Sequence, residues 1–304
     1  MTQPQVADAG PGVGGQGVVG VQGGAGQADA GTAHAGQGEA DRYLVAVDVD
    51  GTLMGWDGTI SAGVLEAVAA VRDAGHHVVL ATGRSVISAA PVAQRLGLTT
   101  GPVVCSNGAV TVRMDPGAPN GYEVVETITF DPEPALRLIR TELPDAAYGV
   151  EEVGRGFYVT KPFPPGEIEG RHVQVDFDDL CRLPATRVVI RSPEHTKEDF
   201  HAIVARLGLH EVSYTVGWVA WLDLNPKGVS KATGLEAVRR QLGVAPGRTV
   251  AIGDGHNDLD MLRWAARGVA MGDADDVVQA AADEVTGSVT QDGVVPVLRG
   301  LLAG

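Results

Sequence analysis

Four aspartates stand in two short clusters, each directly after an apolar segment of the chain. Asp48 and Asp50 form the first cluster, and Asp254 and Asp258 form the second. Carboxylate oxygens suit Mg²⁺, which is typically held by one or two carboxylates together with phosphate and water. Such a cation screens the charge of a phosphoryl group, so that an anion can attack it. The acids therefore predict phosphoryl chemistry with Mg²⁺ as the cofactor.

The position of each acid suggests its role. Asp48 ends an apolar strand, where buried backbone would hold it, so we expect it to be the nucleophile that forms an aspartyl-phosphate. Asp50 lies two residues on, projecting the same way from a looser turn, and we expect it to act as general acid and base. Asp254 would complete the metal site, and Asp258 would orient a metal-bound water or a lysine.

Three further residues are expected to bind the phosphate. Thr82 offers a hydroxyl, and Gly83 lets backbone N–H groups approach an oxygen at the start of the next helix. Lys231 supplies a compact positive charge near another helix start. Thr82 could instead cap the helix that follows it, or have both roles. Lys227 lies near Lys231 and is the alternative lysine.

Apolar segments alternate with helical patterns, which predicts a doubly wound parallel sheet, an α/β Rossmann-like core. Each polar cluster follows the carboxyl end of a strand, the edge where ligands bind in such sheets. The expected strands are 43–47, 77–81, 102–105, 249–252 and 268–271, and the expected helices are 61–74, 85–96 and 229–242, before a C-terminal helix.

The pattern changes between about residues 110 and 223. Strand-like segments at 123–130, 157–160, 187–191 and 218–224 surround helical segments at 133–143 and 196–207. This mixture predicts an inserted α+β cap domain that closes over the substrate. We expect residues 41–110 and 224–304 to form the catalytic core, residues 111–223 to form the cap, and residues 1–40 to be a disordered tail.

The expected tail is rich in Gly, Ala and Gln and has no Lys, Arg or aromatic residue. Such a segment cannot bury enough apolar surface to offset its ordering entropy. Its Gly12-Val13-Gly14-Gly15-Gln16-Gly17 run matches a dinucleotide-binding fingerprint, but no strand precedes it and no helical pattern follows, so we interpret the match as chance.

Charge and composition limit the classes of partner that the chain is expected to have. A net charge of -15 disfavours nucleic acid, because such binding needs clustered Lys and Arg. No apolar run is long enough to span a membrane, and the N-terminus lacks a secretion signal, so we expect cytoplasmic residence. Cys105 and Cys181 match no disulfide framework or zinc spacing. A small phosphorylated metabolite is the expected partner, and the sequence predicts no particular oligomeric state.

The order Asp48-Val49-Asp50-Gly51-Thr52, Thr82, Lys231 and Gly253-Asp254-Gly255-His256-Asn257-Asp258 resembles the four motifs of the haloacid-dehalogenase superfamily. Ser106-Asn107-Gly108, the large insertion and Val269-Ala270-Met271-Gly272 resemble its Cof-type subfamily, which carries an α+β cap. The resemblance extends from about Tyr43 to the C-terminus.

The resemblance implies Asp48 as nucleophile, Asp50 as acid and base, and Thr82 and Lys231 on the phosphate. It implies Mg²⁺ held by Asp48, by the main-chain carbonyl of Asp50 and by Asp254. Asn257 and Asp258 would support the metal and its waters, and Asn107 would lie near the phosphate. Similar dehalogenases lack the second acid at position 50, so phosphoryl chemistry is favoured over carbon–halogen chemistry.

Rival interpretations stay open. A phosphomutase or phosphotransferase would return the aspartyl-phosphate to a second hydroxyl, and a non-catalytic sensor would only bind a phosphorylated ligand. Sugar phosphates and similar metabolites are the default substrates. Arg84 could steer substrate or pair with a surface acid. His76, His77 and His256 are expected to be structural or solvated, Asp176, Asp178 and Asp179 to form a solvated face in a cap loop, and Trp218 and Trp221 to pack the cap.

Overall fold

The computed structural model describes residues 41–209, 212–216 and 219–302. All of them belong to one compact unit, residues 36–304. The expected tail over residues 1–40, with its glycine-rich fingerprint, and the expected packing role of Trp218 lie outside the described residues. Within the part of the chain that the structure describes, no helix combines the length and apolar character needed to span a bilayer.

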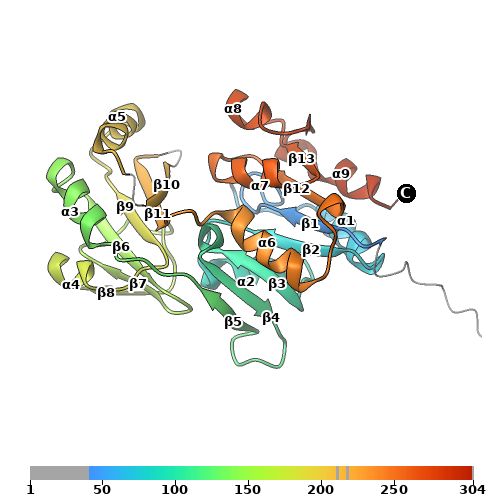
Figure 1. The fold of residues 1–304 in the computed structure, drawn as a ribbon, viewed down its shortest axis with the longest axis horizontal. Helices are drawn as coiled ribbons and strands as arrows, with labels where there is room; N and C mark the ends of the chain where they lie inside the picture. The colour runs from blue at the N-terminus through green and yellow to red at the C-terminus, as the bar shows by residue number, and fades with distance from the viewer. Residues whose placement is uncertain (1–40, 210–211, 217–218, 303–304) are drawn as a thin grey trace, which may run out of the picture. The chain divides into compact units, whose positions relative to one another are not determined.

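Within the described residues, the first sheet has eight strands in the order β14-β13-β12-β1-β2-β3-β4-β5. Figure 1 labels those from β13 to β5. The strands from β14 to β3 run parallel to one another. Strand β4 runs antiparallel to β3, and β5 runs antiparallel to β4. The strands are β1 (Leu44–Val47), β2 (His77–Ala81), β3 (Gly101–Cys105), β4 (Val110–Met114), β5 (Tyr122–Thr127), β12 (Thr249–Gly253), β13 (Arg267–Ala270) and β14 (Glu284–Val285).

Helices cover both faces of this sheet, as the wholly apolar β1 requires. Val45 and Val47 belong to the cluster that includes α1, α2 and α9, whereas Leu44 and Ala46 belong to the cluster that includes α6, α7 and α8. Alternate residues of a strand point to opposite faces, so every position of β1 is buried. The helices are α1 (Ala62–Asp73), α2 (Val86–Arg95), α6 (Lys231–Gln241), α7 (Leu259–Trp264), α8 (Asp276–Gln279) and α9 (Val294–Gly300).

The second sheet has six strands in the order β10-β11-β9-β6-β7-β8. Its strands are β6 (Ala147–Glu152), β7 (Gly156–Val159), β8 (Arg171–Gln174), β9 (Val188–Arg191), β10 (Val212–Val216) and β11 (Trp221–Pro226). One face packs against α3 (Glu133–Glu142), α4 (Phe177–Cys181) and α5 (Lys197–Leu207). The other face carries a smaller apolar cluster that includes Phe157 and Trp221. The fold is thus an α/β core with an inserted α+β cap, as predicted.

The boundary expected for the inserted region is wrong at its start. Residues from 111 onward were assigned to the cap, but β4 and β5 continue the first sheet. Ser106–Gly108 form a tight 3-10 turn that returns the chain as β4 directly beside β3. The alternating pattern identifies a strand without saying which sheet it joins. At the other end, β11 stays in the second sheet as far as Pro226.

A smaller difference concerns the acids at 176–179. They were expected in a loop, but Asp176 precedes α4, and Asp178 and Asp179 lie in its first turn. Asp178 pairs with Arg137 and Asp179 pairs with Arg182 at exposed positions. Acidic residues in the first turn of a helix are favoured by the helix dipole, which gives these residues a structural role.

Candidate active site

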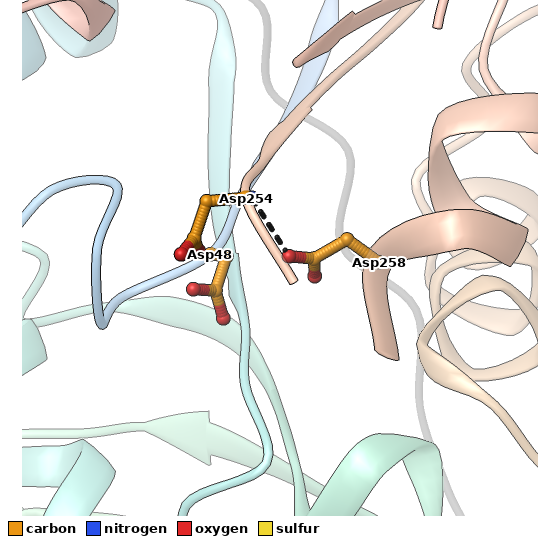
Figure 2. Close-up of side chains that lie close together, drawn as sticks. All are labelled: Asp48, Asp254 and Asp258. Atoms are coloured by element: carbon orange, nitrogen blue, oxygen red, sulfur yellow. Dashed lines mark hydrogen bonds between the residues drawn. The ribbon is translucent and has the colours of Figure 1, made fainter. Parts of the chain in front are cut away.

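Three predicted acids meet at the carboxyl ends of β1 and β12 (Figure 2). Ligand oxygens of Asp48, Asp254 and Asp258 lie within 4.8 Å of one another, and all three residues are buried. Asp48 directly follows β1, and its N–H donates to the carbonyl of Ile252 in β12 at 3.0 Å. Because β1 and β12 are adjacent and parallel, acids at their ends are brought together by the sheet itself.

Lys231 lies between two of these acids. Its Nζ donates to Asp48 Oδ1 at 2.5 Å and to Asp258 Oδ1 at 2.6 Å, and its side chain is fully buried. Burial lowers the pKa of Lys231, but the attraction of Asp258 and Asp48 outweighs it and raises that pKa above its usual value. An ammonium has three N–H donors, so one remains beyond these two bonds.

Asp258 is held differently from the other two acids. Besides Lys231, it accepts at Oδ2 from the backbone N–H groups of Asp254 at 3.0 Å and Gly255 at 2.9 Å. Figure 2 shows the first of these bonds as a dashed line. Both oxygens of Asp258 are therefore occupied in bonds to Lys231 and to the loop after β12.

Two glycines permit the close approach of these loops. Gly51 has φ +79°, and a Cβ there would lie 2.3 Å from Asp254 Oδ2. Gly108 has φ +98°, and a Cβ there would lie 2.1 Å from the carbonyl oxygen of Ser230, next to Lys231. Both positions combine a left-handed backbone with a contact that no side chain would fit. Glycine is required at each for the acids and the lysine to converge.

The charge balance of this group suits a divalent cation. Burial raises the pKa of Asp48 despite the attraction of Lys231, and the carboxylates of Asp258 and Asp254 raise it further. Burial and the neighbouring Asp258 raise the pKa of Asp254 to about 7. Three buried carboxylates share one lysine, so the site has excess negative charge. Buried carboxylate donors with this deficit of positive charge fit a hard cation.

Asp50 lies near the three buried aspartates, which we call the triad, and it is hydrogen-bonded to an arginine. Arg84 donates to it through two bonds, Nε to Oδ2 and Nη2 to Oδ1, both at 2.7 Å. Sequence reasoning left Arg84 open between steering substrate and pairing with a surface acid. Its partner is instead the acid predicted to act as general acid and base.

The residues expected on the phosphate lie at the same sheet edge. Thr82 is buried after β2, and its Oγ1 accepts from the N–H of Arg84 at 3.1 Å, a local bond at the start of the next helical segment. Asn107, with φ +53°, accepts at Oδ1 from Asn257 Nδ2 at 3.0 Å. A Cβ on Gly83 would lie 3.1 Å from Asn107 Oδ1, so these two residues are neighbours as well.

A cavity of about 460 Å³ joins these residues to the second sheet. Its lining includes Asp48, Asp50, Thr82, Gly83, Asp254 and Asn257 from the first sheet's edge. The second sheet and the segments beside it contribute Phe157 of β7, Trp221 and Asp223 of β11, Arg187 just before β9 and Ile168 between β7 and β8, among others. The nucleophile, acid and metal ligands predicted from sequence therefore border one space large enough for a small metabolite. Lys231 borders the triad but not this cavity.

Sequence reasoning missed two groups of polar contacts, which involve Arg187, Asp223 and Glu151. In the first, Arg187 Nε donates to Asp223 Oδ1 at 2.6 Å and Trp221 Nε1 donates to Asp223 Oδ2 at 2.9 Å. In the second, Glu151 of β6 accepts from Ser106 Oγ at 2.7 Å. Glu151, Trp221 and Asp223 lie in strands of the second sheet, whereas Arg187 directly precedes β9 and Ser106 directly follows β3. The tertiary fold brings them together, so no local spacing predicts their contacts. The one available signal was charge inside otherwise apolar strands.

The remaining expectations can be placed. Trp221 packs against Phe163 with ring centroids 5.9 Å apart, as expected for a packing residue of the cap. His76 accepts at Nδ1 from the backbone of Tyr43, a structural role. His256 contacts Asp275, with Nε2 and Oδ2 2.5 Å apart, and borders the cavity.

The sequence and the fold are similar to those of known proteins. A family model described as haloacid dehalogenase-like hydrolase matches residues 45–298. The chain belongs to this family. The resemblance inferred from the motifs is therefore confirmed, and the chain is an enzyme of the phosphatase class within the Cof type.

Several named phosphatases are similar to this chain over most of their length. The 5-amino-6-(5-phospho-D-ribitylamino)uracil phosphatase YitU of Bacillus subtilis is 31% identical over 274 residues, covering 86% of this chain and 98% of that protein. A phosphoglycolate phosphatase of Natronomonas pharaonis is 30% identical over 254 residues, covering 84% and 95%. A solved HAD-superfamily phosphatase from Bacteroides thetaiotaomicron has a TM-score of 0.69 at 26% identity, covering 89% of this chain and 99% of that one.

Proposed function

We propose that this enzyme hydrolyses the phosphate monoester of a small metabolite, with Mg²⁺ as cofactor and through an aspartyl-phosphate on Asp48. The observation that carries the proposal is the meeting of Asp48, Asp254 and Lys231 at one sheet edge, beside Asp50 and a cavity of metabolite size. The named relatives act on small phosphorylated compounds, which supports the same substrate class.

In the first step, a carboxylate oxygen of Asp48 attacks phosphorus, and the bond from phosphorus to the leaving oxygen breaks. Asp50 donates a proton to that oxygen, so the leaving group departs as a neutral alcohol. Arg84, which already holds both oxygens of Asp50, keeps this carboxyl in position.

In the second step, water attacks the same phosphorus while Asp50 takes its proton. The bond from Asp48 to phosphorus then breaks, which releases phosphate and restores the carboxylate. Thr82, Gly83, Asn107 and Lys231 are proposed to bind the phosphoryl oxygens. Lys231 does not line the cavity, and its bond to Asp48 places its positive charge next to the attacking carboxylate.

The metal site is proposed to consist of Asp48, the main-chain carbonyl of Asp50 and Asp254, supported by Asn257 and Asp258. When bound, the ion would supply positive charge that offsets the phosphoryl group and the buried carboxylates. Cytoplasmic residence remains a prediction from the sequence.

The test uses the full chain, incubated with a panel of phosphorylated metabolites while free phosphate is measured. We expect phosphate release with Mg²⁺, loss of release on chelation with EDTA, and recovery when Mg²⁺ is restored. Mg²⁺ should also raise the melting temperature of the wild type, and by less in Asp254→Asn. Activity that is unchanged by chelation would remove the metal from the mechanism. An isomeric ester formed without free phosphate would identify the phosphomutase alternative instead.

A further inference from the structure

A row of three hydrogen-bonded asparagine side chains leads from the cavity toward the second sheet. Asn257, which lines the cavity, donates from Nδ2 to Asn107 Oδ1 at 3.0 Å. Asn107 in turn donates from Nδ2 to Asn225 Oδ1 at 3.3 Å. Asn225 donates from its own Nδ2 to the main-chain carbonyls of Ser106 at 2.9 Å and Thr186 at 3.3 Å. All of these bonds therefore point in one direction along the row.

The amide of Asn107 is fixed because both of its ends are bonded. A half-turn of this amide would set its Nδ2 against Asn257 Nδ2 and its Oδ1 against Asn225 Oδ1, and neither contact is a hydrogen bond. Asn107 and Asn225 are only 5% and 3% exposed, so water offers little replacement for a lost partner. Asn225 therefore determines, together with Asn257, which way the Asn107 amide faces.

Asn225 also holds the turn that carries Asn107. Ser106 and Asn107 have φ +49° and +53°, a left-handed conformation that costs free energy in residues other than glycine. Such a turn persists only where its surroundings hold it. The carbonyl of Ser106 accepts from Asn225, and the Ser106 hydroxyl donates to Glu151 Oε2 at 2.7 Å. Both partners belong to strands of the second sheet, β11 and β6.

The other end of the row reaches the acids of the first sheet. Asn257 directly precedes Asp258 and follows Asp254 and Gly255 in the short segment after β12. A Cβ on Gly255 would lie 2.7 Å from Asn257 Oδ1, so this oxygen faces the same loop while Nδ2 is held by Asn107. Groups that orient the residues around a metal change its affinity without touching the ion.

We propose that Asn225 is a positioning residue of the active site, which acts through Asn107 on Asn257 and so strengthens Mg²⁺ binding. Asn225 itself does not line the cavity, and it lies in β11 of the second sheet. The inference rests on the proposed function, in which Asn257 supports the metal. It adds that a residue of the second sheet orients the metal loop of the first.

Mg²⁺ binding by the full chain tests this role without relying on turnover. The melting temperature is measured over a range of Mg²⁺ concentrations, and the half-saturating concentration is compared between variants. Asn225→Ala should raise that concentration by about 3- to 10-fold, less than the roughly 10- to 100-fold expected for Asn257→Ala beside the metal. Ser213→Ala is the matched control, because Ser213 pairs with Asn225 across β10 and β11 and accepts from the N–H of Gly228. It should leave the half-saturating concentration unmoved.

The double variant Asn225→Ala/Asn257→Ala separates positioning from a general structural effect. If Asn225 acts through Asn257, its loss has no further effect once Asn257 is gone, so the double variant should match Asn257→Ala within about twofold. Multiplied effects in the double variant, or a half-saturating concentration in Asn225→Ala equal to that in Ser213→Ala, would overturn the assignment. Asn225→Ser, whose shorter side chain cannot keep the bonds of the amide, replaces Asn225→Ala if the latter does not fold.

Failure of the proposed function has a different result. A wild type whose melting temperature does not respond to Mg²⁺ contradicts the metal site itself. The variants are then compared for binding of inorganic phosphate by calorimetry, since Asn107 is expected near the phosphate. Asn225→Ala should weaken that binding relative to Ser213→Ala, and the difference should vanish when Asn107→Ala is present in both. Equal phosphate affinities in Asn225→Ala and Ser213→Ala would overturn the positioning role.

Discussion

Arg84 and Asp50 form a two-point ion pair, with both donor–acceptor distances at 2.7 Å. The hydrogen bonds to Asp50 raise the pKa of the Arg84 guanidinium above its ordinary value, and burial opposes this only in part. The planar guanidinium matches a carboxylate at two atoms, which restricts rotation of the Asp50 side chain. The pair therefore orients the carboxyl group that we assign to proton transfer.

Arg84→Ala should lower kcat by about 10- to 100-fold, because a mispositioned catalytic group is costly even when its chemistry is intact. Arg84→Lys should recover only part of this loss, since an ammonium cannot hold both oxygens at once. Steady-state kinetics separate this role from a purely structural one. A change confined to KM, or full recovery by lysine, would contradict the positioning role.

Asp50→Asn should slow turnover by about 10² to 10⁴-fold, the usual contribution of a general acid or base. The first step should be affected most with alkyl phosphates, whose leaving oxygen needs a proton, and least with p-nitrophenyl phosphate. The comparison requires single-turnover rates for the two kinds of ester. Equal losses in the first step for both would argue against proton donation by Asp50. Asp73→Asn, an exposed change, serves as the matched control.

Lys231→Met should destabilise the metal-free protein by about 3 to 5 kcal/mol, because Asp48 and Asp258 would stay buried without their shared cation. Adding Asp258→Asn to this variant should recover part of the loss. Urea unfolding of the single and double variants measures both effects. The exposed Lys161→Met is the control, and a Lys231→Met midpoint equal to that control would refute the buried-pair account.

The sheet edge and its acids could be predicted because they depend on local sequence. An apolar strand followed by Asp48-Val49-Asp50-Gly51-Thr52 specifies both a buried strand and the turn after it. Residues from 111 onward were assigned to the cap, although β4 and β5 continue the first sheet, because a strand-like segment does not encode its pairing partner. Neighbouring strands are chosen by turns such as Ser106–Gly108, whose positive φ angles at non-glycine residues were not foreseeable.

The bonds that hold the site residues were harder to predict than the residues themselves. The partners Arg84 and Asp50 are 34 positions apart, and Ser106 and Glu151 are 45 apart. Contacts at such separations follow from how sheets and loops pack, so a single sequence supplies the side chains without their pairing. Lys231 was predicted as a site residue from its place at a helix start in the expected order of motifs, but its bond to Asp48 was not predicted.

Glu151 supplies a pH prediction. Burial raises its pKa above the usual 4.5, although Arg187 and the bond from Ser106 oppose the shift. As pH rises past 4.5, the unfolded chain releases this proton before the folded protein does, so Glu151 makes stability fall with rising pH. Glu151→Gln should remove this fall, which urea unfolding from pH 4 to 8 would measure.

Glu152, next to Glu151, provides a control because its pKa is shifted in the opposite direction. Its hydrogen bond with Arg171 lowers its pKa, so its contribution to stability is present above the usual value of 4.5 and is lost on acidification. Glu152→Gln should therefore not reproduce the effect of Glu151→Gln. Identical pH dependence in the wild type and Glu151→Gln would show that burial does not perturb this group.

Formation of an aspartyl-phosphate on Asp48 is the central claim, and mass spectrometry of an acid-quenched reaction tests it most directly. With p-nitrophenyl phosphate and Mg²⁺, Asp50→Asn should accumulate one phosphoryl group, since the first step proceeds while hydrolysis lacks its base. Peptide mapping should place that group on Asp48, and Asp48→Asn should show none. If the wild type is active, two results would contradict the central claim. One is an adduct on a residue other than Asp48, and the other is no adduct in Asp50→Asn while that variant turns over slowly.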